Sequence, residues 1–219
     1  MKIFLDTAHV ASIQKLASTG LIAGVTTNPT HVSKEGGSPL DVIKQICALL
    51  PNGAISVEVT EKTPEAVYKQ AQKISKIATN VVVKIPCHLE YCEVIHKLVQ
   101  EGVKINVTLV FSALQGLMMA QLGVAYISPF VGRLNDADAD GNQVVQDLRF
   151  MLDTYNLPTQ LLAASLRSVR DVHNAALAGA DIATMKPELF EQLLHHPLTD
   201  AGMELFDRDW KKLGITQFP

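Results

Sequence analysis

Short apolar, β-branched runs alternate with longer amphipathic segments along the whole chain. Eight runs predict strands, at residues 2–6, 21–25, 55–59, 81–85, 104–109, 124–127, 160–164 and 181–185. Helical periodicity separates them, as at residues 63–77 and 142–156. Continuously apolar strands such as the valines at 81–83 are typical of parallel sheets buried on both faces. The pattern therefore predicts an α/β protein, a single (β/α)8 barrel spanning residues 1–219.

An open, doubly wound sheet is the alternative architecture for alternating strands and helices. It normally has a glycine-rich phosphate loop after its first strand, and this chain has Asp-Thr-Ala-His there. Residues 198–219 form a C-terminal helical extension that carries Phe206 and Trp210 among charged positions. We expect this extension to cover the barrel or to contact another subunit.

Composition narrows the classes of partner. The 219 residues are 47% hydrophobic and carry a net charge of −3, so a nucleic-acid or anionic-membrane partner is not expected. Residues 105–132 lack charge, but Asn106 and Pro129 interrupt them, so we interpret them as buried core. Three cysteines and no hydrophobic leader favour a reduced, cytoplasmic protein without disulfides.

Chemistry in a (β/α)8 barrel is located at the carboxyl ends of the strands. The polar or aromatic residues expected there, in chain order, are Asp6, Thr26, Thr27, Asn28, Glu58, Lys84, Asn106, Thr108, Ser128, Phe130, Arg133, Ser165 and Arg167. Such a density of polar groups beside apolar strands indicates a functional site.

Lys84 is the most informative of these residues, because it interrupts an apolar strand, Val-Val-Val-Lys-Ile-Pro. Burial favours the neutral amine, which attacks carbonyl groups. Asp6 and Glu58 could supply the proton transfers that imine formation and carbon–carbon cleavage require. Two structural alternatives remain open: Lys84 could be held in an ion pair with Glu58 or Asp6, and Asp6 could cap a helix beginning near His9.

A phosphate site is the second candidate feature. Arg133 and Arg167 lie on adjacent βα units, and with Ser165 they could bind a phosphate through forked donors. Surface salt bridges are the alternative role for the two arginines.

The strings LDTA, GVTTNPT, VVVKIP, NVTLVFS, ISPFVGR and AASLR follow one another on the expected strands. In this order they resemble the transaldolase family, in the small subgroup that includes the fructose-6-phosphate aldolases, over nearly the whole chain. The resemblance implies that Lys84 forms a Schiff base, that Asp6 is the acid/base at a substrate hydroxyl, and that Glu58 and Thr108 activate a water molecule. It also implies a substrate-binding set of Thr26, Asn28, Asn106, Ser128 and Phe130, and a phosphate site of Arg133, Ser165 and Arg167.

Two positions separate the subgroups of that family. The transaldolases have Glu and Phe where the aldolases have Gln and Tyr, and this chain has Glu58 and Phe130. The resemblance thus implies a transaldolase that needs no cofactor or metal. It would move a dihydroxyacetone unit from sedoheptulose 7-phosphate to glyceraldehyde 3-phosphate, in the pentose phosphate pathway. Fructose-6-phosphate aldolase and a non-catalytic phosphosugar-binding barrel are the alternatives, and a homo-oligomer, a pentamer or decamer, is expected.

Two metal-like patterns are set aside. Residues 136–147 imitate a calcium loop but have Gln143 and Asp147 at positions that need an apolar residue and a glutamate. Cys87, His88, Cys92 and His96 lack the spacing of a zinc site.

Overall fold

Eight parallel strands close into a barrel in the computed structural model, which describes residues 1–214. The strands follow chain order: β1 (Lys2–Asp6), β2 (Ile22–Thr26), β3 (Ala54–Glu58), β4 (Val81–Pro86), β5 (Ile105–Val110), β6 (Tyr126–Pro129), β7 (Gln160–Ala163) and β8 (Ile182–Met185). Because β1 pairs with both β2 and β8, the sheet has no edge. The prediction of a (β/α)8 barrel is confirmed, and the open sheet is excluded.

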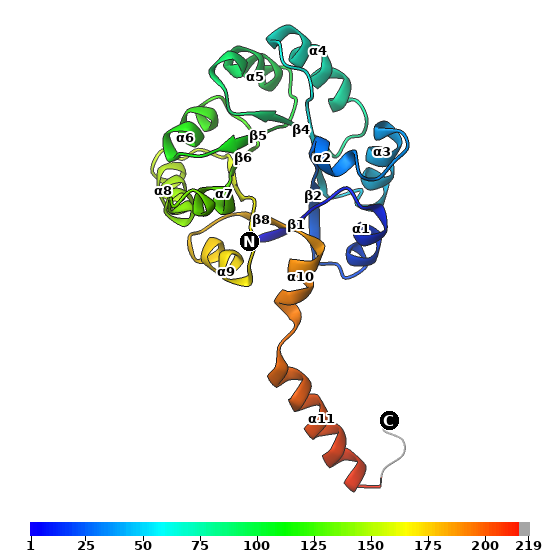
Figure 1. Cartoon of the computed structure of the whole chain (residues 1–219). Coiled ribbons are helices and arrows are strands. Elements are labelled where there is room, and N and C mark those ends of the chain that lie inside the picture. The colour runs from blue at the N-terminus through cyan, green and yellow to red at the C-terminus, as the bar shows by residue number, and fades with distance from the viewer. Residues whose placement is uncertain (215–219) are drawn as a thin grey trace.

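Helices form a ring around the barrel (Figure 1). They are α1 (Val10–Ala17), α2 (Pro29–Val32), α3 (Pro39–Leu49), α4 (Pro64–Ser75), α5 (Cys92–Gln100), α6 (Ala113–Gln121), α7 (Val131–Asp136), α8 (Gly141–Thr154), α9 (Val169–Leu177) and α10 (Pro187–Leu194), with a 3₁₀ turn, η1 (Leu89–Tyr91), before α5. Capping residues determine where the helices begin. Thr63 caps α4, because its hydroxyl accepts a hydrogen bond from Ala66 N–H and Pro64 is the first helical residue. Asp140 caps α8, because its carboxylate accepts hydrogen bonds from backbone N–H groups of the first turn.

The core lies between the strands and the helices, as expected for strands covered on both faces. In β4, Val82 and Val83 are 1% and 0% exposed. The uncharged residues 105–132 contain β5, α6 and β6, with Ile105 and Ile127 fully buried. Their interpretation as core is confirmed for the two strands, whereas Leu114 and Met118 on the outer side of α6 are 65% and 52% exposed. Within residues 1–214, no helix has the length and apolar character needed to cross a membrane.

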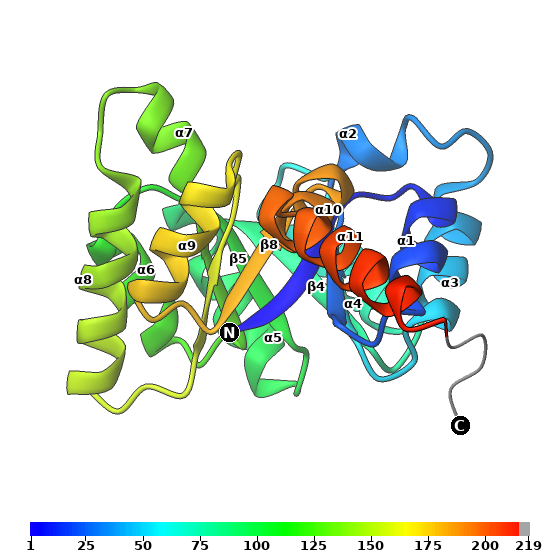
Figure 2. The same ribbon diagram turned by 90° about the horizontal axis from the view of Figure 1, so that it is seen from below.

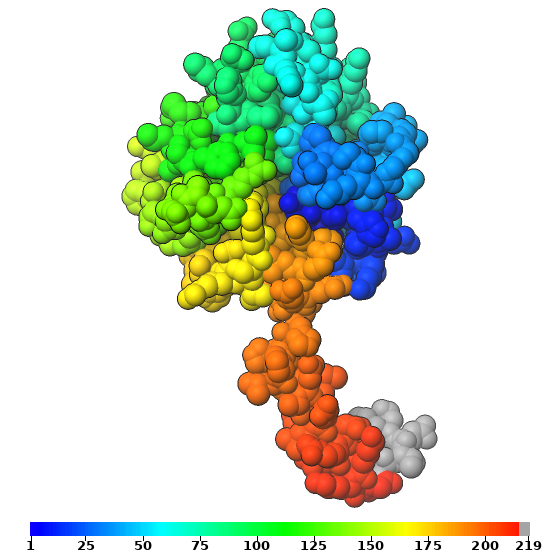
Figure 3. All heavy atoms as spheres, in the orientation of Figure 1, coloured from blue at the N-terminus to red at the C-terminus, as the bar shows by residue number. Residues whose placement is uncertain are grey.

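The C-terminal extension leaves the barrel. Helix α11 (Pro197–Lys212) projects from the rim beyond α10 (Figures 1 and 3), and in the view from below it lies in front of the barrel (Figure 2). None of its residues is buried, and Leu198 and Phe206 are 76% and 73% exposed. The expectation that it covers its own barrel is wrong, because the chain turns outward at His195 and His196, which separate α10 from α11. Residues 215–219 of the predicted extension lie outside the described part.

A candidate active site at the carboxyl end of the barrel

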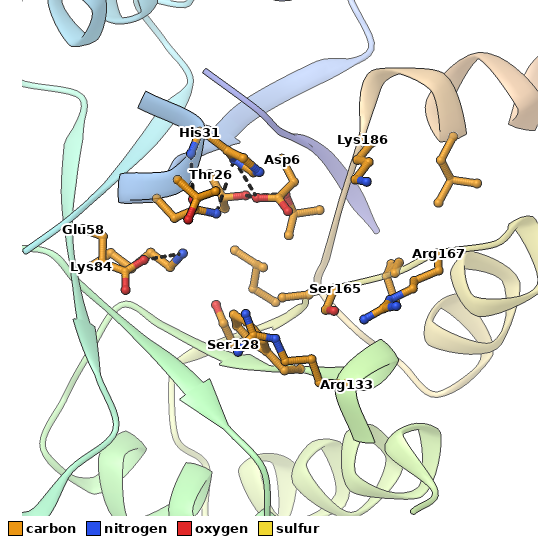
Figure 4. A pocket seen from close by; sticks show the side chains of 18 of the residues that line it. Asp6, Thr26, His31, Glu58, Lys84, Ser128, Arg133, Ser165, Arg167 and Lys186 are labelled. Carbon is orange, nitrogen blue, oxygen red and sulfur yellow. Dashed lines mark hydrogen bonds and ion pairs between the residues drawn. The ribbon is translucent and has the colours of Figure 1, made fainter. Parts of the chain in front are cut away.

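A cavity of about 860 Å³ opens at the carboxyl ends of the strands. Ten of the thirteen residues expected at the strand ends line it: Asp6, Thr26, Asn28, Glu58, Lys84, Ser128, Phe130, Arg133, Ser165 and Arg167. Figure 4 shows Lys84 and Glu58 together on one side of this space and Ser165, Arg133 and Arg167 toward the other. Barrel closure thus gathers side chains from distant parts of the sequence around one cavity.

Lys84 lies on β4 with its side chain inside the barrel, and the residue is only 4% exposed. Its Nζ is 3.0 Å from Glu58 Oε2 and donates a 3.2 Å hydrogen bond to the carbonyl of Thr27. The register explains the pairing, because Glu58 on β3 stands opposite Lys84 on β4. The ion pair considered as an alternative therefore exists, and it lies in the cavity wall, where the same two groups can exchange a proton.

The carboxylate of Asp6, at the end of β1, is held by hydrogen bonds that involve hydroxyl groups on β2 and β8. Thr26 Oγ1 donates to Asp6 Oδ1 at 2.8 Å and lies 2.7 Å from Thr184 Oγ1. A hydroxyl group has one proton to donate, and Thr26 donates its proton to Asp6. Thr184 must therefore be the donor in the hydrogen bond between the two threonines. The alternative that Asp6 caps the first helix is wrong, because His9 is the N-cap of α1 and accepts from Ser12 N–H.

Asn106 and Thr108 on β5 are fully buried and lie outside the cavity lining. Asn106 bonds to two neighbours, donating to Ser56 Oγ at 3.1 Å and accepting from Ser128 Oγ at 2.7 Å. It thereby fixes the hydroxyl of Ser128, which does line the cavity. Thr108 Oγ1 is buried without a hydrogen-bond partner in the described structure, which leaves that hydroxyl open to a small polar ligand.

The arginine side of the cavity is built by α7 and the segment after β7. Arg167 forms a 2.6 Å ion pair with Asp136, and Arg133 lies over the ring of Phe130, 5.0 Å from its centroid. A Cβ on Gly132 would stand 2.0 Å from the carbonyl oxygen of Ser165 and 2.9 Å from Arg167 Nε. Only glycine therefore allows α7 to approach closely enough to place both arginines beside Ser165.

Two cavity residues have left-handed backbone. Leu109 has φ +57° and Ser165 has φ +61°, a region that side chains other than glycine enter at a cost of about 1–3 kcal/mol. Leu109 falls where the β5–β6 register shifts by one residue, between Val107 and Val110. The strain is located where β5 and β7 turn into the loops that form the site.

Sequence reasoning missed further residues of this site, four of which matter for its chemistry or shape. Thr184 and Lys186, at the end of β8, line the cavity, and so does His31 on the short helix α2. Gly132 supports the arginine side from behind. Alignment of the predicted strands could have identified Thr184, because its side chain lies on the same face of the barrel as that of Thr26. No sequence pattern marks His31 or Gly132 as part of the site.

The metal-like patterns have structural roles. Asp140 caps α8 and Asp136 pairs with Arg167, while the Cys92 thiol donates to the carbonyl of His88 and His96 bonds to Gln100. Within residues 1–214, no three His, Cys, Asp or Glu side chains converge on a position that could hold a metal ion. Burial, assisted by nearby Cys92, raises the pKa of Cys87 to about 11.

Comparisons with known proteins identify relatives of this chain over nearly its whole length. A family model described as Transaldolase/Fructose-6-phosphate aldolase matches residues 3–217. A "Probable transaldolase" of Lactiplantibacillus plantarum is 50% identical over 99% of this chain and 100% of its own length. Relatives of the same description from Dehalococcoides mccartyi (97% of this chain, 99% of that protein) and Parvibaculum lavamentivorans (98% of each) are 48% and 46% identical.

A solved structure shows the fold alone. The Coccidioides immitis chain described as a "putative fructose-1,6-biphosphate aldolase" superposes with a TM-score of 0.59 at 9% identity, over 84% of this chain and 73% of that one. The family match and the relatives also show the family of this chain, because they extend over nearly all of its residues. This chain is an enzyme of the transaldolase/fructose-6-phosphate aldolase family.

Proposed function

We propose that this enzyme is a transaldolase that carries a three-carbon dihydroxyacetone unit on Lys84. The observation that supports this is the burial of the Lys84 amine in the cavity wall, 3.0 Å from a carboxylate. An amine that becomes a covalent carrier divides the transfer into two easier reactions and retains the three-carbon fragment between them. The donor is sedoheptulose 7-phosphate and the acceptor is glyceraldehyde 3-phosphate.

The first half-reaction begins at the Lys84–Glu58 pair. Glu58 takes a proton from Lys84, the neutral amine attacks the C2 carbonyl carbon of the donor, and a carbinolamine forms. Glu58 then returns its proton to the C2 hydroxyl, which leaves as water, and the protonated Schiff base remains. The Thr108 hydroxyl, buried and without another partner in the described structure, is suited to hold that water.

Cleavage follows at Asp6. Its carboxylate takes the proton of the C4 hydroxyl, the C3–C4 bond breaks, and the electron pair moves into the iminium group. Erythrose 4-phosphate leaves, and an enamine stays on Lys84. The enamine attacks the aldehyde carbon of glyceraldehyde 3-phosphate, Asp6 returns the proton to the new hydroxyl, and hydrolysis through Glu58 releases fructose 6-phosphate.

The remaining residues bind substrate in this proposal. Ser128, oriented by Asn106, and Asn28, at the start of α2, are suited to sugar hydroxyls. Thr26 positions Asp6, and Phe130 forms an apolar wall. Arg133, Ser165 and Arg167 bind the phosphate, at the end of the cavity farther from Lys84, which matches an extended sugar phosphate.

Borohydride trapping tests the proposal. The enzyme is incubated with fructose 6-phosphate and borohydride, and peptide mass spectrometry locates the adduct. We expect a reduced dihydroxyacetone or hexose adduct on Lys84, none in Lys84→Met, and normal labelling in the control Lys104→Met. An adduct on another lysine, or full turnover by Lys84→Met, would contradict the mechanism.

The same preparation separates the alternatives. A fructose-6-phosphate aldolase releases free dihydroxyacetone at a rate comparable with transfer, whereas a transaldolase releases it far more slowly. A phosphosugar-binding barrel would bind the substrates and give neither product nor adduct. Phe130 favours transfer, because it offers no hydroxyl to protonate the enamine. Glu58 favours transfer because the resemblance associates glutamate at this position with the transaldolases.

We further propose that the enzyme acts in the cytoplasm as a homo-oligomer assembled through α11. The exposed apolar side chains of Leu198, Met203 and Phe206 on a helix that leaves its own barrel suit a second copy of the chain. Light scattering tests this: Phe206→Glu should lower the particle mass. The control Leu177→Glu, equally exposed on α9 at 75%, should not. A monomeric mass for the unmodified protein would contradict the proposal.

A further inference from the structure

His31 holds the side chain of Asn28 at both of its ends. Asn28 is the N-cap of α2, and its Oδ1 accepts a 2.9 Å hydrogen bond from the His31 backbone N–H. Its Nδ2 lies 3.3 Å from Nδ1 of the His31 ring. The orientation of the Asn28 amide, which faces the cavity, therefore depends on His31.

This arrangement fixes the ring proton. Because Oδ1 of Asn28 already accepts from a backbone N–H, the group facing the ring is the NH₂, which can only donate. His31 Nδ1 must accept that hydrogen bond, so it carries no proton, and the neutral ring has its proton on Nε2.

The same Nδ1 faces the proposed proton acceptor. It lies 3.8 Å from Asp6 Oδ1, with the His31 and Asp6 side chains 19% and 26% exposed. Figure 4 shows His31, Thr26 and Asp6 together on one side of the cavity. At 3.8 Å no hydrogen bond forms, but a charge on the ring would act strongly on the carboxylate.

Burial is the main cause that lowers the pKa of His31 below 6.5. The negative charge of Asp6 on β1 opposes this shift. The positive charges of Lys84 on β4, Lys34 after α2, and Lys186 before α10 add to the lowering. His31 is therefore neutral near pH 7, the form that Asn28 requires.

We propose that His31 is a positioning residue for carbon–carbon cleavage, whose neutral ring orients Asn28 and leaves Asp6 free to act as a base. Protonation of Nδ1 turns the acceptor of Asn28 into a donor, so that the two N–H groups oppose each other. It also places a cation beside Asp6 that stabilises the carboxylate and makes it a poorer proton acceptor. The inference rests on the roles proposed for Asp6 and Asn28.

Two substitutions separate the effects. His31→Asn places an amide oxygen near the position of Nδ1, so it can accept from Asn28 but cannot titrate. His31→Leu removes the acceptor as well. His173→Asn, on the exposed side of α9, is the control.

The test is the pH dependence of kcat and KM between pH 5 and 8. We expect the unmodified enzyme and His173→Asn to lose kcat as pH falls through a midpoint below 6.5. His31→Asn should lack that decrease and keep its KM within about twofold, whereas His31→Leu should lack it and show a KM raised about tenfold, the effect of losing one hydrogen bond to the orienting amide. The same acid decrease in His31→Asn as in the unmodified enzyme would overturn the proposal.

Nitrogen NMR of histidine-labelled protein gives a readout that does not depend on turnover. The neutral His31 ring should carry its proton on Nε2 and titrate below pH 6.5, and Asp6→Asn should move that midpoint lower by removing the negative charge. A proton on Nδ1 would overturn the proposal. Borohydride labelling of Lys84 keeps the two proposals apart: without an adduct the transaldolase mechanism fails, whereas a normal adduct with unchanged pH profiles refutes only the role of His31.

Discussion

Glu58 Oε2 lies 3.0 Å from Lys84 Nζ, because the β3–β4 register sets the two residues side by side at the cavity. We expect Glu58→Gln to preserve a hydrogen-bond acceptor at this position and to remove the proton carrier. The value of kcat should fall by about 10²–10⁴-fold, the usual contribution of a general acid–base. Borohydride labelling of Lys84 should slow as well.

The exposed neighbour Glu61 provides the control for that substitution, since it follows β3 and points to solvent. Glu61→Gln should keep full activity. Equal kcat values for Glu58→Gln and the unmodified enzyme would show that another group transfers the proton.

In the proposed mechanism, Phe130 controls the fate of the enamine. Its ring packs edge-on against Phe111, at 5.9 Å between centroids, and lies under Arg133 in the cavity. Phe130→Tyr adds a hydroxyl that can deliver a proton to the enamine or to water, so the ratio of dihydroxyacetone release to transfer should rise. Phe150→Tyr, on the exposed face of α8, should leave the ratio unchanged. An unchanged ratio in Phe130→Tyr would argue against this role.

Gly132 determines how closely α7 approaches Ser165 and Arg167. Gly132→Ala would push the carbonyl of Ser165 away, since no Cβ can stand 2.0 Å from an oxygen. We expect KM for glyceraldehyde 3-phosphate to rise at least about tenfold, a loss of roughly 1.4 kcal/mol of phosphate binding, with little change for unphosphorylated glyceraldehyde. Gly202→Ala on α11, where an added Cβ would have no atom of a neighbouring element within 4 Å, is the matched control.

Thiol reactivity reports on burial beside β4. The pKa of Cys87, raised by burial from 9.0 to about 11, means that at pH 8 its thiolate is about 100-fold rarer than that of an ordinary cysteine. Iodoacetamide should therefore modify Cys87 about 100-fold more slowly in the folded protein than in urea, as peptide mass spectrometry can measure. Between pH 9 and 11 the unfolded chain loses this proton first, so rising pH lowers the free energy of unfolding. Equal rates in both states would contradict the shift.

Several site residues could be predicted because their signal is local. Lys84 interrupts a run of valines, and the strand ends are visible from the change to polar residues, so ten of the thirteen residues expected at the strand ends line one cavity. Asn106 and Thr108 were placed on the correct strand, but whether a side chain there reaches the cavity or lies beneath it depends on the barrel's packing.

The outward path of α11 and the position of His31 in the site could not be predicted from the sequence, for a related reason. An amphipathic helix buries its apolar face against some surface, and its sequence does not say whose. His31 stands in a four-residue helix, where no periodicity develops, and it meets Asp6 only because β1 and β2 pair in parallel.

Periodicity, turn residues and strand-end chemistry determined the barrel, the order of its units and the lysine at its centre, because each depends on neighbours within a few positions along the chain. The tertiary structure decided that Glu58 pairs with Lys84, that Gly132 lets α7 approach Ser165 closely, and that the ring of His31 faces Asp6. These contacts join residues far apart in sequence, and their geometry exists only once eight strands have closed on one another.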